Sequence, residues 1–488
     1  MTIWTLRYVA TIAATLAWRG LSFEPAPIER SSAAPAVGAS RIQSATFNGM
    51  KPGVSTLGEV GEEWGRPTKA IRHGADIRHV YTIEPFERVD AVFCRQRLVS
   101  LVVHLRQAFD APVLAEQLEL GEFTPVAIVD DAGTSIGLVY PERAVTFRFV
   151  AGNDAQVVRI EMNEIAAAPF LLRAEAQRTC NCAGCLADIE QAISISPDSP
   201  EPLVLRAQLQ FALADYSAAL ASSTAALKRN PKDPASLTIH AQVLAALGNE
   251  QQALAAVNEA IANGMSTPYR KAAALVVRGQ LLFNRVKPDG KGALDQYVQA
   301  IQLAEAVLDD HTGHCRDARE VLIDAHALAA VAIAHGDWND RAIAVPKWLA
   351  KAIELSDRSF PEDRDPARLR VCRWALSACT VDDLHLDPTP WVAAIEQAAA
   401  RLNAAIDDPQ SVAMLERELG LALNDAMRAH EDRGDAAGAK YCVTRAAACF
   451  EHMAVLDPTM ALRMRPSEGT TRQSEETVAG RPLPMQRR

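Results

Sequence analysis

A spacing of 34 residues, repeated in the middle of the chain, constrains the fold more than any other feature of the sequence. Pro197 and Pro231 are separated by this interval. Small and aliphatic residues repeat it in successive steps, at Leu186/Leu220/Leu254, Ala192/Ala226/Ala260 and Ile193/Leu227/Ile261. A fixed period of this length predicts an array in which each unit stacks on its neighbours. We expect the alanines where two helices of one unit touch, and a proline where the second helix ends.

These residues resemble the tetratricopeptide repeat (TPR), a hairpin of two helices. The positions of that repeat are matched by Leu203, Ala207, Asp215-Tyr216, Ala219-Leu220, Ala226-Leu227 and Pro231, and then by Leu237, Ala241, Gly248-Asn249, Ala253-Leu254 and Ala260-Ile261. The resemblance implies TPR repeats over 164–267, with units at 166–199, 200–233 and 234–267. Insertions and longer helical stretches after this point predict irregular TPR-like hairpins over 268–462.

Residues 45–163 show a different pattern, which is typical of strands. Short stretches of alternating, β-branched or aromatic residues are separated by turn signals. Helices are expected at Ser55–Trp64 and Pro112–Leu120. Pro85-Phe86-Glu87-Arg88 and Pro141-Glu142-Arg143 each lead into a strand, a turn and a second strand, which indicates a weak internal duplication. The predicted fold class is α+β: a small β-rich N-terminal module of helix plus antiparallel strands, followed by an α-helical TPR-like solenoid.

The start of this β-rich module carries a recognisable pattern in Gly53-Val54-Ser55, Glu59-Val60 and Trp64-Gly65-Arg66-Pro67. Ser55 would cap a helix that Gly65 ends and that Pro67 cannot continue. The pattern resembles the small outer-membrane assembly lipoproteins of the SmpA/OmlA type. Val54 departs from it, because that family has a Met there, and no cysteine follows the N-terminal apolar stretch to carry a lipid anchor. The resemblance implies a fold and a bacterial envelope setting, not an activity.

The two ends of the chain differ from the rest in composition. In residues 1–19, Arg7 precedes an apolar stretch, Tyr8–Trp18, which is shorter than the ~20 residues of a membrane span and is typical of a secretory signal. Residues 20–44, rich in Pro, Ala and Ser, predict a flexible linker, and residues 463–488 a disordered tail. We predict an exported, periplasmic or envelope-associated protein; retention by the N-terminal segment as an anchor and a cytoplasmic location are the alternatives.

Charge and motifs exclude several classes of function. The chain has 50 Lys+Arg against 60 Asp+Glu, a formal net charge of −10, which disfavours a nucleic-acid partner. The sequence contains no glycine-rich phosphate loop, nucleophile elbow or His-Glu-x-x-His helix. The carboxylate pairs Asp130-Asp131 and Asp407-Asp408 fall at turns or helix ends, and we interpret them as turn formers. The prediction is a non-catalytic protein without a cofactor.

Cysteine and histidine clusters are the remaining candidates for chemistry. Cys180-x-Cys182-x-x-Cys185 could supply three zinc ligands, but no fourth ligand lies nearby, so a structural role is favoured over a metal, redox or disulfide role. His311-x-x-His314-Cys315 is interpreted as a helix N-terminus. Two further pairs, Cys372/Cys379 and Cys442/Cys449, are each seven residues apart, which is ~11 Å along a helix and too far for a disulfide. We therefore predict no metal site.

By the resemblance to TPR proteins, a bound peptide would contact the concave face of the first helix of each unit. The predicted groove residues are Glu201, Val204, Gln208 and Phe211 in one unit, and Ala235, Thr238, Gln242 and Ala245 in the next. The Lys/Asn pattern that clamps a C-terminal carboxylate in some TPR proteins is missing. We therefore predict a protein–protein interaction scaffold for an unknown protein or peptide. The alternative is a structural or ligand-binding envelope protein, in which the β-rich module binds and the helices position it.

Overall fold

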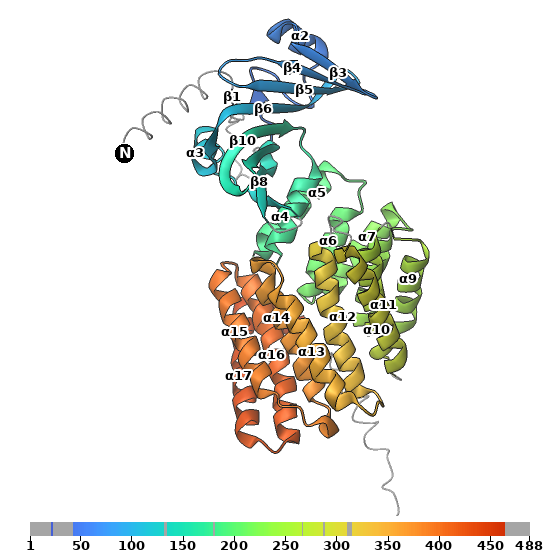
Figure 1. Cartoon of the computed structure of the whole chain (residues 1–488). Helices are drawn as coiled ribbons and strands as arrows, with labels where there is room; N and C mark the ends of the chain where they lie inside the picture. Colours follow the sequence, from blue (N-terminus) through green and yellow to red (C-terminus); the bar gives the residue numbers. More distant parts are fainter. Residues whose placement is uncertain are drawn as a thin grey trace, which may run out of the picture. The chain divides into compact units, whose positions relative to one another are not determined.

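The chain divides into two compact units in the computed structural model (Figure 1). The structure describes residues 21–22, 42–130, 134–178, 181–265, 267–285, 288–309 and 315–463. The sheet unit comprises Met1–Ala176 with Ala187–Asp198, and the helical unit comprises Gln177–Leu186 with Ser199–Arg488. The predicted signal-like segment, most of the predicted linker and nearly all of the predicted tail lie outside the described residues.

The sheet unit is built on one antiparallel sheet of eight strands in the order β3-β4-β5-β6-β10-β9-β8-β7. The strands are β3 Lys69–His73, β4 Asp76–Tyr81, β5 Arg88–Cys94, β6 Arg97–Asp110, β7 Val126–Val129, β8 Ser135–Tyr140, β9 Val145–Val150 and β10 Asn153–Asn163. The order is a mirror image about the central β6–β10 pair, and each four-stranded half follows a short helix, α2 (Leu57–Trp64) or α3 (Ala111–Gln117). This is the arrangement expected of the predicted duplication. A separate pair, β1 (Leu21–Ser22) and β2 (Thr46–Phe47), precedes it.

One face of this sheet forms the hydrophobic core of the unit. Side chains alternate between faces along a strand, and those pointing to one face pack with residues of α2 and α3, including Val60 and Leu114. The cap of the first helix lies one residue later than predicted, and the helix begins at Leu57. Thr56, not Ser55, is the N-cap of α2, and Glu59 completes a capping box with it. The Ser55 hydroxyl instead accepts a hydrogen bond from the Lys51 N–H at 3.0 Å.

One buried arginine forms hydrogen bonds with a helix and with the segments next to β7 and β8 in the sheet unit. Arg173 lies on α4 (Ala167–Gln177), and its Nε and Nη2 donate to the two carboxylate oxygens of Asp188 at 2.8 and 2.6 Å. Its two Nη atoms also donate to the Glu142 carboxylate at 3.2 and 2.5 Å, and Nη1 donates to the Thr124 carbonyl at 2.6 Å. Burial works against the charged guanidinium, but Asp188 and Glu142 more than offset it and raise the pKa of Arg173.

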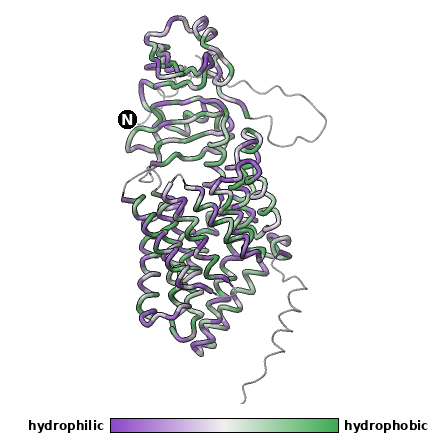
Figure 2. Tube along the Cα trace, turned by 90° about the vertical axis from the view of Figure 1, so that its right-hand side faces the viewer, coloured by the Kyte–Doolittle hydropathy of each residue, from purple (hydrophilic) through white to green (hydrophobic). Residues whose placement is uncertain are grey.

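The helical unit is a TPR-like array of helical hairpins. Its helices are α6 Glu201–Ala212, α7 Tyr216–Arg229, α8 Pro234–Ala246, α9 Glu250–Ala262, α10 Pro268–Phe283, α11 Gly290–Asp309, α12 Cys315–His335, α13 Arg341–Asp357, α14 Pro361–Cys379, α15 Thr389–Ala405, α16 Pro409–Asp432, α17 Ala436–Leu456 and α18 Pro458–Arg463. The first residues of α6, α8 and α10 (201, 234 and 268) are 33 and 34 residues apart. The predicted contact alanines Ala219, Ala226, Ala253 and Ala260 are all 0% exposed. Figure 2 shows hydrophobic and hydrophilic residues alternating along the helices, as amphipathic helices require.

α12 is the most enclosed helix of this array. Every residue from Ala325 to Ala334 is buried, and all but His326 are apolar. A helix that is hydrophobic all round lies inside a structure rather than on its surface. No helix among the described residues is long and apolar enough to span a membrane.

Gly279 on α10 offers a test of this close packing. A Cβ added there would collide with the ring of Tyr297 on α11, which is 1% exposed and has no room to move. We expect Gly279→Ala to destabilise the helical unit by roughly 1–3 kcal/mol, as overpacking does. Guanidinium denaturation followed by circular dichroism would measure it. The control is Gly61→Ala on α2, where a Cβ meets nothing within 4 Å and where we expect a gain of up to ~1 kcal/mol. Equal effects at both sites would contradict the packing described here.

Candidate interaction surface

The first helices of successive hairpins form one layer of the helical unit. α6, α8, α10, α12, α14 and α16 each contact the next in the series. This is the layer on which the sequence places the peptide groove. In an open TPR-like array such a layer is the concave surface.

The eight predicted groove residues differ in how accessible they are. Glu201 and Gln208 are exposed, Phe211, Ala235, Thr238, Gln242 and Ala245 are half-buried, and Val204 is buried at 8% exposure. Thr238 donates its hydroxyl to the Pro234 carbonyl at 2.7 Å. Ala245 packs against the core between α8 and α9. Gln208 and Gln242, one repeat apart, are therefore the members of the set best suited to hydrogen-bond a partner.

The two ends of the array meet, which the sequence does not indicate. Arg417 on α16 donates to the carbonyl of Ala212 at the end of α6 at 3.3 Å. Arg463 on α18 lies 2.8 Å from a carboxylate oxygen of Asp215 and donates to the Leu213 carbonyl at 3.4 Å. The last hairpin thus lies against the first one, directly beside the predicted groove residue Phe211.

A second junction joins the start of α5 (Cys182–Ile195) to the start of α16. The Asp408 carboxylate accepts hydrogen bonds from Ser411 N at 2.8 Å and from Cys182 N at 3.1 Å, so one side chain caps two helices. The Ser411 hydroxyl donates to the same carboxylate at 2.7 Å and accepts from Cys182 N at 3.0 Å. The sequence predicts a turn former at Asp408, and the structure adds a second role, the cap of a helix far away in the chain. Its second partner is 226 residues away in the chain.

A band of ion pairs crosses the layer from α12 to α16. Asp324 on α12 accepts from Arg370 Nε on α14 at 3.0 Å. Arg373 on α14 and Arg417 on α16 both donate to the Glu418 carboxylate, the latter at 2.9 Å. These pairs join three neighbouring first helices through their side chains.

Asp324 and Arg370 are deeply set but remain in contact with solvent. Their side chains are 34% and 33% exposed, yet burial raises the pKa of Asp324 although Arg370 opposes the shift. Burial also works against the charged form of Arg370, but Asp324 and Glu320 more than offset it and raise the pKa of Arg370. Ionisable groups with perturbed pKa values are enriched at functional sites, which makes this pair a candidate part of one. The sequence signal for them is a carboxylate, Asp324, at the border between the charged first half and the apolar second half of α12.

The structure describes only part of the predicted cysteine and histidine clusters. No group of three or more His, Cys, Asp or Glu side chains that could hold a metal ion occurs in the part of the chain that the structure describes. Cys182 and Cys185 are buried in α5, whereas Cys180, His311 and His314 lie outside the described residues. Burial raises the pKa of Cys372, Cys379 and Cys449 to about 12 and that of Cys442 to about 11. These thiols are therefore protonated and unreactive near neutral pH.

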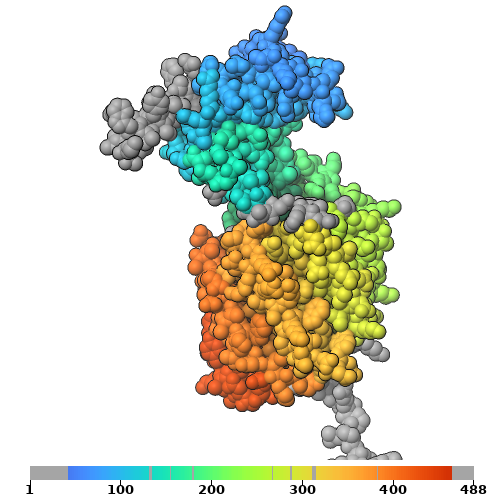
Figure 3. Space-filling view, in the orientation of Figure 1, coloured from blue at the N-terminus to red at the C-terminus, as the bar shows by residue number. Residues whose placement is uncertain are grey.

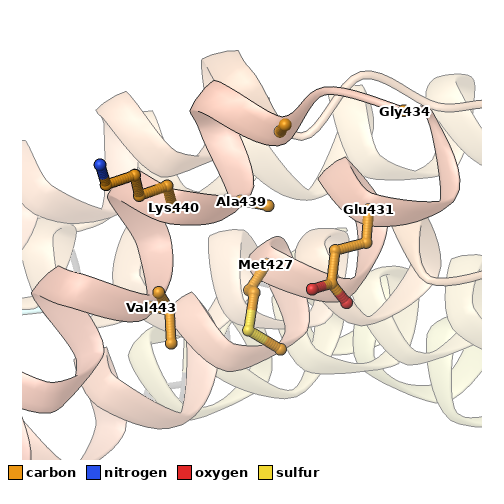
Figure 4. A pocket seen from close by; sticks show the side chains of 7 residues that line it. Met427, Glu431, Gly434, Ala439, Lys440 and Val443 are labelled. Atoms are coloured by element: carbon orange, nitrogen blue, oxygen red, sulfur yellow. The ribbon is translucent and has the colours of Figure 1, made fainter.

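A hollow of about 450 Å³ lies where α16 turns into α17 (Figure 4). Its lining consists of Met427, Glu431, Gly434, Ala436, Ala439, Lys440 and Val443. Mostly apolar residues with one carboxylate and one ammonium group are what the junction of two amphipathic helices produces. On the face that Figure 3 shows, the side chains of the described helices from α12 to α17 form a continuous surface.

No model of a known protein family matches the chain, and no curated protein matches it in sequence. The resemblance to the SmpA/OmlA type therefore stays a prediction. Solved structures do match the chain at low identity. The Rap protein complexed with Competence and Sporulation Factor is 13% identical, matches 60% of this chain and 77% of its own, and has a TM-score of 0.40.

Two further solved structures are similar over much of the same length. A tetratricopeptide repeat protein from Parabacteroides merdae is 14% identical over 58% of this chain and 98% of its own, with a TM-score of 0.25. The human IFIT1 dimer with PPP-AAAA is 14% identical over 58% of this chain and 72% of its own, with a TM-score of 0.29. With TM-scores this low, none of these structures indicates a ligand or a partner for this chain.

Proposed function

We propose that this protein is a non-catalytic scaffold that holds an extended segment of a partner protein on the layer of first helices in the helical unit. The observation that carries the proposal is the arrangement of this layer. Gln208, which is exposed, and Gln242, which is half-buried, lie one repeat apart on this layer, and the partly exposed Asp324–Arg370 pair lies on its helices α12 and α14. An extended backbone offers hydrogen-bonding groups at regular spacing, which amide side chains can satisfy. A protein partner is proposed rather than nucleic acid because the chain has a net charge of −10.

The cell envelope is the proposed location. It is supported by the signal-like residues 1–19 and by the resemblance of Gly53–Pro67 to the SmpA/OmlA type. The second candidate is an envelope protein in which the sheet unit binds and the helices position it. The observation that favours it is the duplicated eight-stranded sheet, whose second face carries charged side chains.

The proposal predicts that negative charge placed on the layer of first helices weakens capture of the partner. Gln208→Glu with Gln242→Glu adds two carboxylates at the proposed contact, and we expect partner recovery to fall by about tenfold, as a loss of ~1.4 kcal/mol would give. The measurement is affinity capture from cross-linked cells, quantified by mass spectrometry.

The matched control is Gln251→Glu with Gln252→Glu, the same chemical change on the exposed face of α9. It should leave recovery unchanged. Val204 is left unchanged in both double variants, because a carboxylate at that buried position would disturb folding itself. Equal recovery with both double variants would exclude this layer as the binding surface and would favour the sheet unit.

A further inference from the structure

The face of the sheet opposite the core carries a row of basic side chains across four neighbouring strands. Arg88 of β5 lies opposite His104 of β6, His104 lies opposite Arg159 of β10, and Arg159 lies opposite Arg148 of β9. Adjacent strands are ~4.8 Å apart, so each basic group is next to another. We call Arg88, His104, Arg159 and Arg148 the cross-strand cation row.

The row belongs to the second face because its strand neighbours belong to the core. Val89, Val103, Ile160 and Phe147 directly precede or follow the four members in sequence, and all are buried in the hydrophobic cluster of the sheet unit. Side chains of consecutive strand residues point to opposite faces. The four basic groups therefore share one face.

Two carboxylates on the same face neutralise only part of this charge. Asp90 lies 3.1 Å from Arg88 Nε, which makes one balanced pair. Glu161 is shared: the same oxygen, Oε1, is 3.1 Å from Arg148 Nε and 2.9 Å from an Nη of Arg159. Two guanidinium groups thus converge on one carboxylate, which leaves a surplus of one positive charge.

His104 adds no charge to this surplus near neutral pH. Burial first and then the facing Arg88 hold the pKa of His104 below its ordinary value, whereas Asp90 partly opposes them. Arg88 lies 3.0 Å from the ring Nε2. The surplus is therefore located at Arg148 and Arg159, whose side chains are 30% and 41% exposed, against 16% for the Glu161 that they share.

We propose that Arg148 and Arg159 form a docking site for a carboxylate of an acidic segment on a partner protein. This surface is separate from the layer of first helices in the proposed function and does not depend on it. Guanidinium groups pair with carboxylates through parallel N–H donors, and these two share a single acceptor. A carboxylate carries one negative charge and matches the surplus of one. A phosphate group carries about −1.5 to −2, which the row, with Asp90 and Glu161 already present, would leave unbalanced.

The test is the affinity of the full-length protein for a fluorescent oligoglutamate peptide, measured by anisotropy at low ionic strength. We expect Arg148→Gln with Arg159→Gln to raise the dissociation constant about tenfold or more, because charge-assisted hydrogen bonds are lost. Arg66→Gln with Arg72→Gln, the same charge change at exposed positions of this unit, should leave it unchanged. An equal loss of peptide affinity in both double variants would mean that only the net charge of the protein matters, and it would overturn the proposal.

A second variant separates binding from a structural role and does not depend on the stability of the first. Glu161→Gln removes the internal competitor and frees both guanidinium groups, so peptide affinity should rise several-fold, roughly twofold to tenfold. No increase would contradict the proposal. Parallel titrations with polyphosphate and with anionic phospholipid vesicles decide the source of the anion. Binding of either that is tighter than that of oligoglutamate, or no binding of the peptide at all, would overturn the carboxylate assignment.

Discussion

Arg173→Met is expected to lower the unfolding free energy of the sheet unit by roughly 3–5 kcal/mol, the cost of removing one partner from a buried ion pair. Arg173 donates five hydrogen bonds, to Asp188, to Glu142 and to the Thr124 carbonyl. Methionine fills a similar volume but donates none. Asp188 would then remain as a buried carboxylate without its cation.

Guanidinium denaturation would measure the loss of unfolding free energy, and hydrogen exchange would show which segments open. Amides of β7 and β8 and of α4 should exchange faster together, because Arg173 is what joins these segments. Arg106→Met is the control, since Arg106 pairs with Glu84 at the surface and such pairs contribute ~0–1 kcal/mol.

A rescue variant sharpens the Arg173 experiment. Arg173→Met with Asp188→Leu and Glu142→Gln removes the stranded charges, and it should recover most of the lost stability because apolar replacement of a buried ion pair is often neutral. If the single variant were as stable as the Arg106 control, the network would contribute nothing to the fold.

Asp408→Ala should destabilise the helical unit by roughly 2–3 kcal/mol, more than the loss of an ordinary helix cap, which costs ~1 kcal/mol. The reason is that its carboxylate caps both α5 and α16. The chain contains its own matched control. Asp233-Pro234-Ala235-Ser236 has the same Asp-Pro-x-Ser order as Asp408-Pro409-Gln410-Ser411.

Asp233 caps a single helix, α8, through Ser236 N at 2.8 Å. Asp233→Ala should therefore show the ordinary cost, with faster amide exchange confined to α8. Asp408→Ala should expose the first turns of both α5 and α16 to exchange. Identical losses in the two variants would mean that the bond to Cys182 adds nothing.

The two Asp-Pro-x-Ser segments also show how far the sequence alone can lead. Local order predicts a helix start at both places, because proline at the first turn and an acidic cap are short-range signals. The contact to Cys182 leaves no such signal, since the two residues are 226 positions apart. The same holds for Arg417 and Arg463, which reach back to the α6–α7 turn.

The sequence predicts well those features that depend on residues close together in the chain. The alanines at the 34-residue spacing are fully buried, because only small side chains fit between paired helices. The duplicated strand pairs, β5–β6 and β9–β10, follow Pro85-Phe86-Glu87-Arg88 and Pro141-Glu142-Arg143, as the sequence predicts. The cap of α2 was misplaced by one residue, because Ser55 and Thr56 are chemically equivalent caps and only the backbone decides between them. The ion pair of Asp324 and Arg370 was missed because it joins two helices that no repeat spacing relates.

The contact between the two ends of the helical array changes how its stability depends on its units. In an open repeat array, stability is close to a sum of nearest-neighbour terms, and units can be added to or removed from either end. Here Arg417 and Arg463 attach the last hairpin to the first, so the last unit is also a neighbour of the first. Insertion or deletion of a single repeat anywhere between them would therefore move Arg417 and Arg463 away from their partners on the first hairpin, a cost that an array without this junction does not have.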